Sequence, residues 1–534
     1  MSLNFKQLSF WFLPIVLCFC FEFALAEFRI YNVRNFLENI GFAISLLVLI
    51  SVFQAFSWKS KLAKVIYILF LFSLFIESSF YYLFSTYFSA SSIFILLETN
   101  PAEAIEFTKM YFDIHLVWFF LLHLGFIILY LKSKYQPILT FKLRIKPSYK
   151  LLFFISLLAM IKLSGLIVAN FPYHLLKGVS GYIYEIEKYE DLEIDTKTGN
   201  FQNVDFLGEN SAHTFVMIIG ESTTRRQMGI YDFYRETTPL LSQRKSDLLI
   251  YDDVLSSEAH TIPSLQAALS LNNFENKTES TIIQLMNQAG FKTFWLSNQR
   301  PIGMYETLLT KLSKAADVYK YTNTAQWGSV TPYDEVLLPY LDEALQDKSK
   351  NKFIVINLLA THGQYHLRYS DRFKTFTEIP KTKFHSEKSY KSINDYHNAI
   401  TYVDFMVDEI IDRVEAQNQK SYVLYFSDHG EEVFFDRDFF GHNDSDVPTR
   451  SMFEIPFFVW LSPEYKSTYE LNFKPKRPYV INDLLHSMSD LSRIHFEEHK
   501  PNRSIFSDDF KPKPRIIGSG IDYDEYFEDY LKAD

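Results

Sequence analysis

The run HTFVMIIGES at residues 213–222 changes abruptly from apolar to polar. Its apolar part, which contains Val, Ile and Phe, predicts a buried β-strand over residues 213–220. Glu221 follows directly, so a carboxylate lies where this strand opens into a loop. Taken alone, such a carboxylate is most often a helix cap or part of a solvated turn, and its meaning depends on the rest of the chain.

Further β-rich runs follow this strand, separated by segments of helical length. They cover residues 248–254, 291–296, 353–359, 422–426 and 455–460. This alternation predicts an α/β domain over residues 210–534, with a mainly parallel sheet covered by helices. Ligands bind such sheets where the carboxyl ends of the strands open into loops, and the polar motifs of this sequence fall there.

The first 170 residues are far more apolar. Five stretches, residues 8–26, 40–56, 65–87, 116–131 and 151–169, can cross roughly 30 Å of hydrocarbon at about 1.5 Å per residue, the second and fourth only just. We therefore expect a transmembrane domain of five helices over residues 1–170. Within it, Glu77 and His123 are expected to face other helices or the lipid headgroups, because both are costly to expose to lipid.

The two parts of the chain also differ in charge. Residues 1–170 contain 14 Lys and Arg against 8 Asp and Glu, whereas the remaining residues contain 39 against 55. An acidic second part argues against a nucleic-acid partner, because phosphate backbones attract Lys and Arg rather than carboxylates. The Lys-rich loops at residues 59–64 and 132–150 indicate the cytoplasmic side and the acidic loop at residues 98–113 the outer side, which places the large domain outside.

Residues 171–209 are predicted to link the two parts. Within this linker, residues 182–192 form either an amphipathic helix on the membrane surface or a plain connection. The tripeptide Ala24-Leu25-Ala26 resembles a signal-peptidase site, but the loops place the large domain outside whether or not it is cut. Only Cys18 and Cys20 are present, both in the first apolar stretch, so the soluble part has no disulfide.

Two polar motifs close to each other in the chain suggest a metal site. SDHGEE at residues 427–432 follows one predicted strand, and GHND at residues 441–444 comes shortly after it. Asp, Glu and neutral His are natural ligands for zinc in a mixed oxygen and nitrogen site. Asp428 and His429 can share one ion if the backbone turns sharply, a turn that Gly430 permits. A further histidine, His362, lies in THG at residues 361–363, after another predicted strand.

Thr261 lies in the segment SSEAHTIP, residues 256–263, before the helix-like run at residues 264–271. Threonine before proline and an apolar periodic run is a common helix start, so Thr261 could simply cap a helix. The same position offers free N–H groups and a partial positive charge, which suit a phosphoryl group. A hydroxyl bound to a metal there would be an activated nucleophile.

Several of these blocks together resemble the phosphoethanolamine transferases, a family of the alkaline phosphatase and sulfatase superfamily. The resemblance begins with IIGEST at residues 218–223, RRQM at 225–228, Tyr231 and RETTP at 235–239, and continues through Thr261, SNQ at 297–299, THG at 361–363, SDHGE at 427–431 and GH at 441–442. It extends over almost the whole chain, since the family also has five amino-terminal spans. It implies a soluble α/β/α sulfatase-like domain on the periplasmic side of the bacterial inner membrane.

The resemblance also implies roles for particular residues. Glu221, Thr261, Asp428 and His429 correspond to the ligands of one principal zinc ion, with Thr261 also the nucleophile. His362 and His442 correspond to residues that assist catalysis by protonating the leaving oxygen, by binding phosphate or by holding a second zinc, and Asn298 is a candidate substrate contact. The implied reaction transfers phosphoethanolamine from phosphatidylethanolamine to lipopolysaccharide core or lipid A through a threonine intermediate. The lack of cysteines in the soluble part favours the core-modifying branch.

Three other functions remain open at this point. A phosphoglycerol transferase acting on a membrane glycan has similar spans and a threonine nucleophile. A sulfatase needs a Cys or Ser that becomes formylglycine, with Arg four positions later, whereas this chain has Thr261 and Leu265. A non-catalytic membrane sensor would not require these side chains together. The acceptor's attachment position, the number of metals, the oligomeric state and the role of the acidic tail at residues 522–534 are not encoded in any motif.

Overall fold

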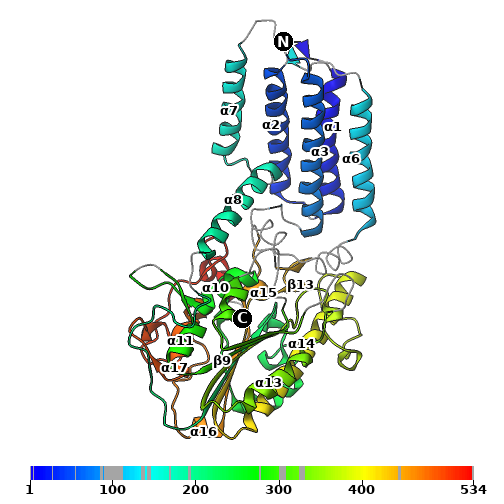
Figure 1. Cartoon of the computed structure of the whole chain (residues 1–534). Coiled ribbons are helices and arrows are strands. Elements are labelled where there is room, and N and C mark those ends of the chain that lie inside the picture. Colours follow the sequence, from blue (N-terminus) through cyan, green and yellow to red (C-terminus); the bar gives the residue numbers. More distant parts are fainter. Residues whose placement is uncertain are drawn as a thin grey trace. The chain divides into compact units, whose positions relative to one another are not determined.

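The computed structural model describes residues 2–3, 5–26, 28–53, 56–84, 88, 112–133, 139–140, 146–167, 170–190, 194–275, 278–299, 308–323, 331–442 and 447–531. The described chain forms two compact units that divide between residues 185 and 186, with the elements labelled in Figure 1. Most of the predicted loops at residues 98–113 and 132–150 lie outside the described residues, as do residues 443 and 444 of the GHND motif.

The first unit consists mainly of long apolar helices: α1 (Phe5–Leu25), α2 (Ile30–Val52), α3 (Lys59–Phe84), α6 (Ile114–Lys132) and α7 (Pro147–Leu163). Among the described residues, the first four are long and apolar enough to cross a membrane. Each predicted stretch coincides with one of these five helices, but α7 has only 17 residues and is not among the four. The second prediction began too late, because α2 starts at Ile30 rather than at residue 40.

The early start of α2 is explained by buried polar partners between the helices. The Asn39 amide donates to the Glu77 carboxylate at 3.0 Å, and Ser73 donates to the same carboxylate at 2.8 Å. Glu22 of α1 accepts from Asn32 of α2 at 2.8 Å. The polar first turn of α2 is therefore compatible with this apolar unit, since its Asn32 side chain is hydrogen-bonded to Glu22 of α1. Glu77 and His123 are both buried, so both face other helices.

Helix α8 (Phe171–Glu190) occupies much of the predicted linker. Its first N–H group, on Phe171, donates to Glu77 of α3 at 2.8 Å, and the N–H of Asn170 donates to Glu38 of α2 at 3.2 Å. Residues 182–190 of the segment predicted as either amphipathic or plain are helical. The linker thus begins as a helix tied to the first unit by two carboxylates.

A seven-stranded sheet forms the centre of the second unit. In spatial order its strands are β10 (Val318–Tyr321), β9 (Lys292–Ser297), β11 (Asn351–Asn357), β4 (His213–Gly220), β12 (Lys420–Ser427), β15 (Phe457–Leu461) and β5 (Leu248–Ile250). The first five are parallel, and β15 is antiparallel to both of its neighbours. The mainly parallel sheet predicted from the sequence is confirmed.

Two details of the strand prediction were wrong. The run at residues 248–254 is not one strand, because β5 ends at Ile250 and Val254–Leu255 forms β6, which pairs with β16 (Tyr479–Val480). Strand β10 was not predicted at all. It has four residues, VYKY, of which three are exposed, so it lacks the apolar run that marks a buried strand.

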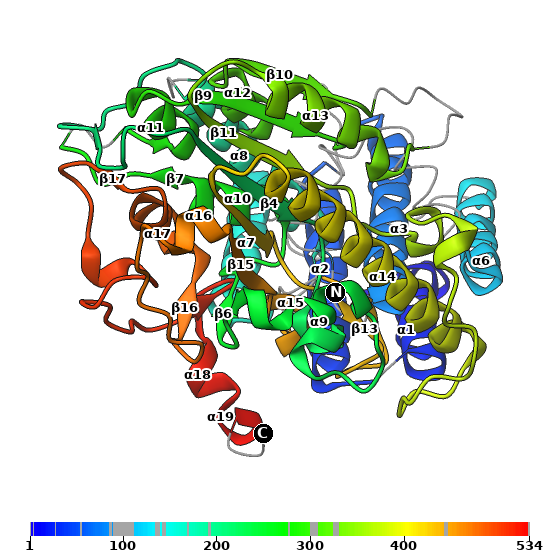
Figure 2. The same ribbon diagram turned by 90° about the horizontal axis from the view of Figure 1, so that it is seen from below.

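Helices cover both faces of the sheet, as Figure 2 shows. On one face Phe215, Met217 and Ile219 of β4 pack into a core shared with α10 (Thr261–Leu269), α11 (Ile282–Gln288), α12 (Leu308–Lys314), α16 (Pro463–Lys466) and α17 (Leu484–Leu491). On the other face lie α13 (Leu338–Gln346) and α14 (Glu387–Glu415), which contact β9, β4 and β12. All eight residues of β4 are buried because each face of this central strand meets a helical layer.

Shorter elements complete the second unit. Its remaining helices are α9 (Pro239–Gln243), α15 (Arg450–Phe453), α18 (Tyr523–Tyr526) and α19 (Glu528–Leu531), and its remaining strand pairs include β13 (Glu432–Val433) with β14 (Phe440–Gly441), β7 (Ser270–Leu271) with β8 (Ser280–Thr281), β17 (Ile494–His495) with β3 (Asp205–Phe206), and β18 (Ile516–Ile517) with β19 (Ile521–Asp522).

The register of the parallel strands determines where the polar motifs meet. Gly220 of β4 is opposite Ser427 of β12, Ile219 is opposite Asn357 of β11, and Asn357 is opposite Ser297 of β9. Four neighbouring strands therefore end almost level. The residues that follow them are brought to one edge of the sheet.

Candidate active site

Glu221 is the first residue beyond the central strand β4, and the turn that holds it is strained. Ser222 has a φ of +52°, a left-handed conformation that is uncommon for a residue with a side chain. Its N–H donates to Asp428 Oδ1 at 3.0 Å, and its hydroxyl donates to Glu221 Oε1 at 2.8 Å. Tyr396 of α14 supports the same turn by donating to the carbonyl of Ser222 at 2.8 Å. These bonds fix the Glu221 carboxylate at the sheet edge.

Asp428 and His429 follow the adjacent strand β12 and are fully buried. The N–H of His429 donates to Asp428 Oδ1 at 2.7 Å, whereas Asp428 Oδ2 accepts no hydrogen bond within the described residues. His429 Nδ1 lies 2.8 Å from the Gly430 carbonyl, so Nδ1 carries a proton, and Nε2 is the atom that could bind a metal ion in place of its own proton. Nε2 lies 3.5 Å from Glu221 Oε1 and 3.4 Å from Asp428 Oδ2.

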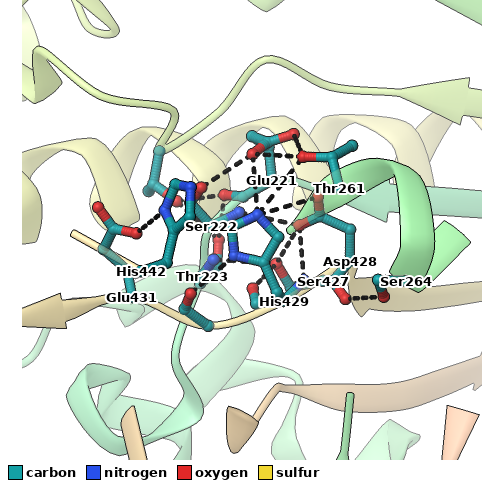
Figure 3. Close-up of polar contacts among 12 residues, drawn as sticks. Glu221, Ser222, Thr223, Thr261, Ser264, Ser427, Asp428, His429, Glu431 and His442 are labelled. Atoms are coloured by element: carbon teal, nitrogen blue, oxygen red, sulfur yellow. Dashed lines mark hydrogen bonds and ion pairs between the residues drawn. The ribbon is translucent and has the colours of Figure 1, made fainter. Parts of the chain in front are cut away.

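Thr261 is the first residue of helix α10, and its hydroxyl does not cap that helix. The hydroxyl oxygen lies 3.3 and 3.4 Å from the two Glu221 oxygens and 3.4 Å from His429 Nε2. Ser264, one turn later, donates to the carbonyl of Asp428 and so ties the start of α10 to the end of β12. Figure 3 shows the Thr261 hydroxyl, Glu221 and Asp428 directed toward His429. The structure thus turns Thr261 toward the acidic site.

These buried groups strongly change one another's proton affinity. Burial and the neighbouring charge of Glu221 raise the pKa of Asp428 to about 7. Burial opposes ionisation of Glu221, but a hydrogen bond from His429 and the charges of His362 and His429 lower its pKa to about 2. Burial likewise opposes protonation of His429, yet Asp428 and Glu221 raise its pKa to about 10. The carboxylates of Glu221 and Asp428 therefore stabilise a positive charge placed between them.

Glu221, Asp428 and His429 each offer one ligand atom within 4.8 Å of the others. Two carboxylates and an imidazole form a set of donors that suits zinc, and the unbonded Asp428 Oδ2 is an acceptor for which a cation would compensate. The residues present therefore fit a metal ion.

A second group of potential ligands shares His429. His429, Glu431 and His442 also bring ligand atoms within 4.8 Å of one another. Glu431 Oε2 lies 2.6 Å from His442 Nδ1, and Glu431 Oε1 accepts from the Tyr365 hydroxyl at 2.6 Å. The ring centres of His429 and His442 are 4.4 Å apart. His442 is partly exposed, so it can reach a substrate while Glu431 orients it.

His362 and Asn298, both predicted as site residues, differ in their relation to Glu221. The charge of His362 acts on Glu221, so this partly exposed imidazole belongs to the surroundings of the site. The Asn298 amide instead donates to the Pro332 carbonyl and to Asp334, both at 2.9 Å. The structure commits the Asn298 amide to a buried network and does not direct it toward Glu221.

Gln299, the residue after Asn298, lies beside Glu221, where the sequence had placed Asn298. Gln299 Nε2 donates to Glu221 Oε2 at 3.0 Å and to the carbonyl of Leu358 at 3.1 Å. It follows β9 as Glu221 follows β4, so its place after a strand was a usable signal. By donating this hydrogen bond, Gln299 orients Glu221, a candidate metal ligand, without itself being a ligand.

Gly430 is required for a reason other than the one the sequence suggested. It does not adopt a positive φ. Its N–H donates to the carbonyl of Met452 at 2.8 Å, and a Cβ at this position would lie 2.1 Å from the carbonyl oxygen of Ser451. Glycine is needed because another backbone segment passes too closely, and the turn itself would accept other residues.

Comparison with known proteins identifies the family. The sulfatase family model matches residues 213–494. Phosphoethanolamine transferase EptC of Escherichia coli K12 is 32% identical over 507 residues, covering 88% of this chain and 85% of its own. The chain belongs to the phosphoethanolamine transferase family. This transferase carries Glu221, Asp428, His429 and Thr261 together at the carboxyl edge of its sheet.

Solved structures agree with this assignment. The zinc complex of the periplasmic domain of E. coli EptC has 34% identity and a TM-score of 0.58, covering 61% of this transferase and 97% of that domain. The integral membrane lipooligosaccharide phosphoethanolamine transferase A of Neisseria meningitidis has 19% identity and a TM-score of 0.71, covering 93% and 96% of the two chains. The second structure shows that the fold is shared over nearly the whole length.

Residues that support the site were not assigned from the sequence. Glu431 stood inside a recognised motif, but nothing in the motif said that it would pair with His442. Tyr365 and Tyr396 lie in a short 3₁₀ turn and in the middle of α14, where an aromatic residue ordinarily belongs to the core. Only the folded transferase shows that both donate hydrogen bonds to the site's framework.

Proposed function

We propose that this transferase moves phosphoethanolamine from phosphatidylethanolamine to a periplasmic glycolipid, with lipopolysaccharide core as the first choice of acceptor and lipid A as the second. Thr261 is the nucleophile and becomes phosphoethanolamine-threonine during the reaction. The observation that carries the proposal is the position of the Thr261 hydroxyl, 3.3–3.4 Å from Glu221 and His429 at the start of a helix. The absence of cysteines from the soluble unit supports the core-modifying branch.

One zinc ion is proposed as the principal cofactor. Glu221, Asp428, His429 and the hydroxyl of Thr261 would hold it, and His442 with Glu431 would add ligands if a second ion binds. When bound, zinc lowers the pKa of a coordinated hydroxyl and offsets negative charge on phosphoryl oxygens. The crystal structure of the E. coli EptC domain as a zinc complex supports this choice of metal.

In the first half of the proposed reaction, the Thr261 oxygen attacks phosphorus of the donor lipid. A bond forms between that oxygen and phosphorus while the bond from phosphorus to the glycerol oxygen breaks. The proton released by the Thr261 hydroxyl passes to the glycerol oxygen, which leaves as diacylglycerol. The partly exposed His442, held by Glu431, is the candidate that delivers this proton, and His362 is the candidate that binds the phosphoryl oxygens.

The second half reverses these roles. A hydroxyl or phosphate oxygen of the acceptor attacks the same phosphorus, and the bond to Thr261 breaks. The proton lost by the acceptor returns to the threonine oxygen, so the protein ends unchanged. The amino terminus of α10 favours the anionic phosphoryl group in both halves, because its N–H groups carry partial positive charge.

The membrane helices give this reaction a location. We propose that they lie in the bacterial inner membrane, with the catalytic unit in the periplasm. Donor and acceptor lipids are then both confined near one leaflet, and a site tethered to the membrane meets them at high effective concentration.

Mass spectrometry of the trapped intermediate tests the proposal. The purified full-length chain is mixed with phosphatidylethanolamine and no acceptor, then digested, and the peptide that contains Thr261 is weighed. We expect the added mass of one phosphoethanolamine group, and none in Thr261→Ala. A phosphoglycerol adduct from phosphatidylglycerol would make the chain a phosphoglycerol transferase instead, and an unmodified peptide with ongoing turnover would exclude the threonine intermediate.

A further inference from the structure

A lysine-rich segment lies on the surface of the otherwise acidic second unit. Residues 374–388, which we call the lysine strap, contain four lysines against two glutamates. One of these glutamates, Glu378, is paired with Arg235 at 2.6 Å. Within the described residues Lys374, Lys381 and Lys383 have no carboxylate partner, and all three are exposed. The strap therefore presents an uncompensated positive charge, although residues 171–534 contain 39 Lys and Arg against 55 Asp and Glu.

The strap is irregular up to Ser386, where α14 follows, and its backbone is well anchored. The side chain of Asn398 in α14 accepts from the N–H groups of Thr375 and Phe376 at 2.9 and 2.8 Å. The N–H of Lys381 donates to the Tyr234 hydroxyl at 3.0 Å, and the ammonium group of Lys381 lies 4.9 Å from the centre of that ring. Because the backbone is held at both places, the lysines keep a defined position rather than moving with a loose loop.

The strap contacts the hairpin that connects two residues of the site. Hairpin β13–β14 begins directly after Glu431 and ends directly before His442. The hydroxyl of Thr382 donates to the Phe434 carbonyl in this hairpin at 3.2 Å. The ammonium group of Lys388 lies 4.9 Å from the centre of the Phe440 ring. The positive surface thus contacts the same short segment that leads to the partly exposed His442.

We propose that the lysine strap binds the phosphorylated saccharide of the glycolipid acceptor while the acceptor's reacting oxygen lies at His442. This inference rests on the proposed function and adds the place where the acceptor is recognised. Exposed ammonium groups attract phosphate groups, and the exposed Tyr234 ring beside Lys381 offers an apolar face to a sugar. A saccharide that carries several phosphates fits both features.

The donor lipid fits the strap less well. Phosphatidylethanolamine carries an ammonium group, which lysines repel, and its single phosphate must reach Thr261 and the acidic cluster. An acceptor carries phosphates besides the reacting oxygen and can engage both places at once. Charge therefore assigns the strap to the second half of the reaction.

Charge reversal at two strap positions provides the test. The full-length chain carrying Lys381→Glu and Lys383→Glu is placed in vesicles, with Lys348→Glu plus Lys511→Glu as the control. Both control lysines are exposed, and the control makes the same change in charge. Diacylglycerol release without acceptor measures the first half, and transfer to lipopolysaccharide measures both halves. We expect the KM for lipopolysaccharide to rise about tenfold in the strap variant, with less than a twofold change in diacylglycerol release.

Other results would overturn the inference. An equal fall in both measurements would assign the strap to the donor or to folding, and no change in either would remove its role. A fall that appears only in vesicles containing phosphatidylglycerol would make the strap a membrane contact instead. Binding to lipopolysaccharide micelles is compared in a Thr261→Ala background, which needs no turnover. Weaker binding by the strap variant supports the inference even if no diacylglycerol is released, whereas equal binding contradicts it.

Discussion

The two units of this chain both bury carboxylates, but the buried carboxylates differ in the hydrogen bonds that they accept. In the membrane unit, Glu77 accepts from Ser73, Asn39 and the N–H of Phe171, at 2.8–3.0 Å. In the catalytic unit, Asp428 is equally buried and its Oδ2 accepts no hydrogen bond within the described residues. The first carboxylate is satisfied by neutral donors. The second is left with an acceptor that needs a cation.

This difference separates a structural cluster from a candidate catalytic one. A buried acid surrounded by amides and hydroxyls joins helices and fixes their packing. A buried acid beside a second acid, an imidazole and a hydroxyl stores unfavourable charge that a metal can offset. Burial and residue type alone would not have distinguished the two clusters. They are distinguished by the hydrogen-bond partners of each carboxylate oxygen.

The largest effect is expected at the nucleophile. Thr261→Ala should lower phosphoethanolamine transfer at least about a thousandfold, because the variant lacks the hydroxyl that is proposed to form the covalent intermediate. Transfer in vesicles is the measurement, and bound zinc and thermal unfolding show whether the site remains. Thr261→Ser keeps a hydroxyl and should retain some transfer. Full activity of the alanine variant would end the proposed mechanism.

A large effect is also expected at the acid that lacks a donor. Asp428→Asn should reduce bound zinc and lower transfer by about a hundredfold or more, because an amide oxygen is a weaker ligand for a divalent ion. Chelation of the unaltered chain should likewise remove activity, and added zinc should restore it. Asp412→Asn makes the same change on the exposed side of α14 and should leave bound zinc and transfer unchanged. An unchanged metal content in Asp428→Asn would refute the assignment of this ligand.

A smaller effect should separate Gln299 from its neighbour. Gln299→Ala removes the donor to Glu221 Oε2 and should weaken zinc affinity about tenfold to a hundredfold, as the loss of an outer partner typically does. Metal titration of the purified chain is the measurement. Asn298→Ala should instead lower thermal stability, because Asp334 loses a buried donor. If Asn298→Ala weakened acceptor or donor binding without loss of stability, the substrate role predicted from the sequence would stand.

The smallest effect on activity is expected in the membrane unit. Glu77→Gln places an amide where three donors converge, so one donor loses its acceptor and stability should fall by about 1–3 kcal/mol. Heating the chain in detergent measures this loss. The candidate metal site lies in the other unit, and bound zinc should be unchanged. Loss of transfer with a stable, zinc-loaded chain would show that the membrane cluster takes part in the reaction.

Much of the fold could be predicted because its signals are local. The strand at residues 213–220 was located to the residue, since a buried parallel strand is an unbroken apolar run. The membrane helices were also recognisable, but α2 starts earlier than predicted because Asn32 in its polar first turn is hydrogen-bonded to Glu22, which belongs to another helix. Edge strand β10 was missed because an exposed strand carries no such run.

The candidate site could be predicted in part. Glu221, Asp428 and His429 follow predicted strands, and the structure brings them together with Thr261. Glu431 and Gln299 needed the structure, because a motif gives residue types and does not say which side chains will face each other. The reason for Gly430 also lay in another segment, whose backbone passes beside it.

By itself, the sequence determined the two-part organisation, the parallel sheet and the set of chemical groups at its edge, because hydropathy and strand ends are properties of neighbouring residues. Only the tertiary structure decided that strands β9, β11, β4 and β12 end level, that Thr261 turns from its helix toward His429, and that a lysine-rich segment adjoins the His442 hairpin. These facts depend on strand register and on contacts between residues far apart in the chain, which local patterns do not specify.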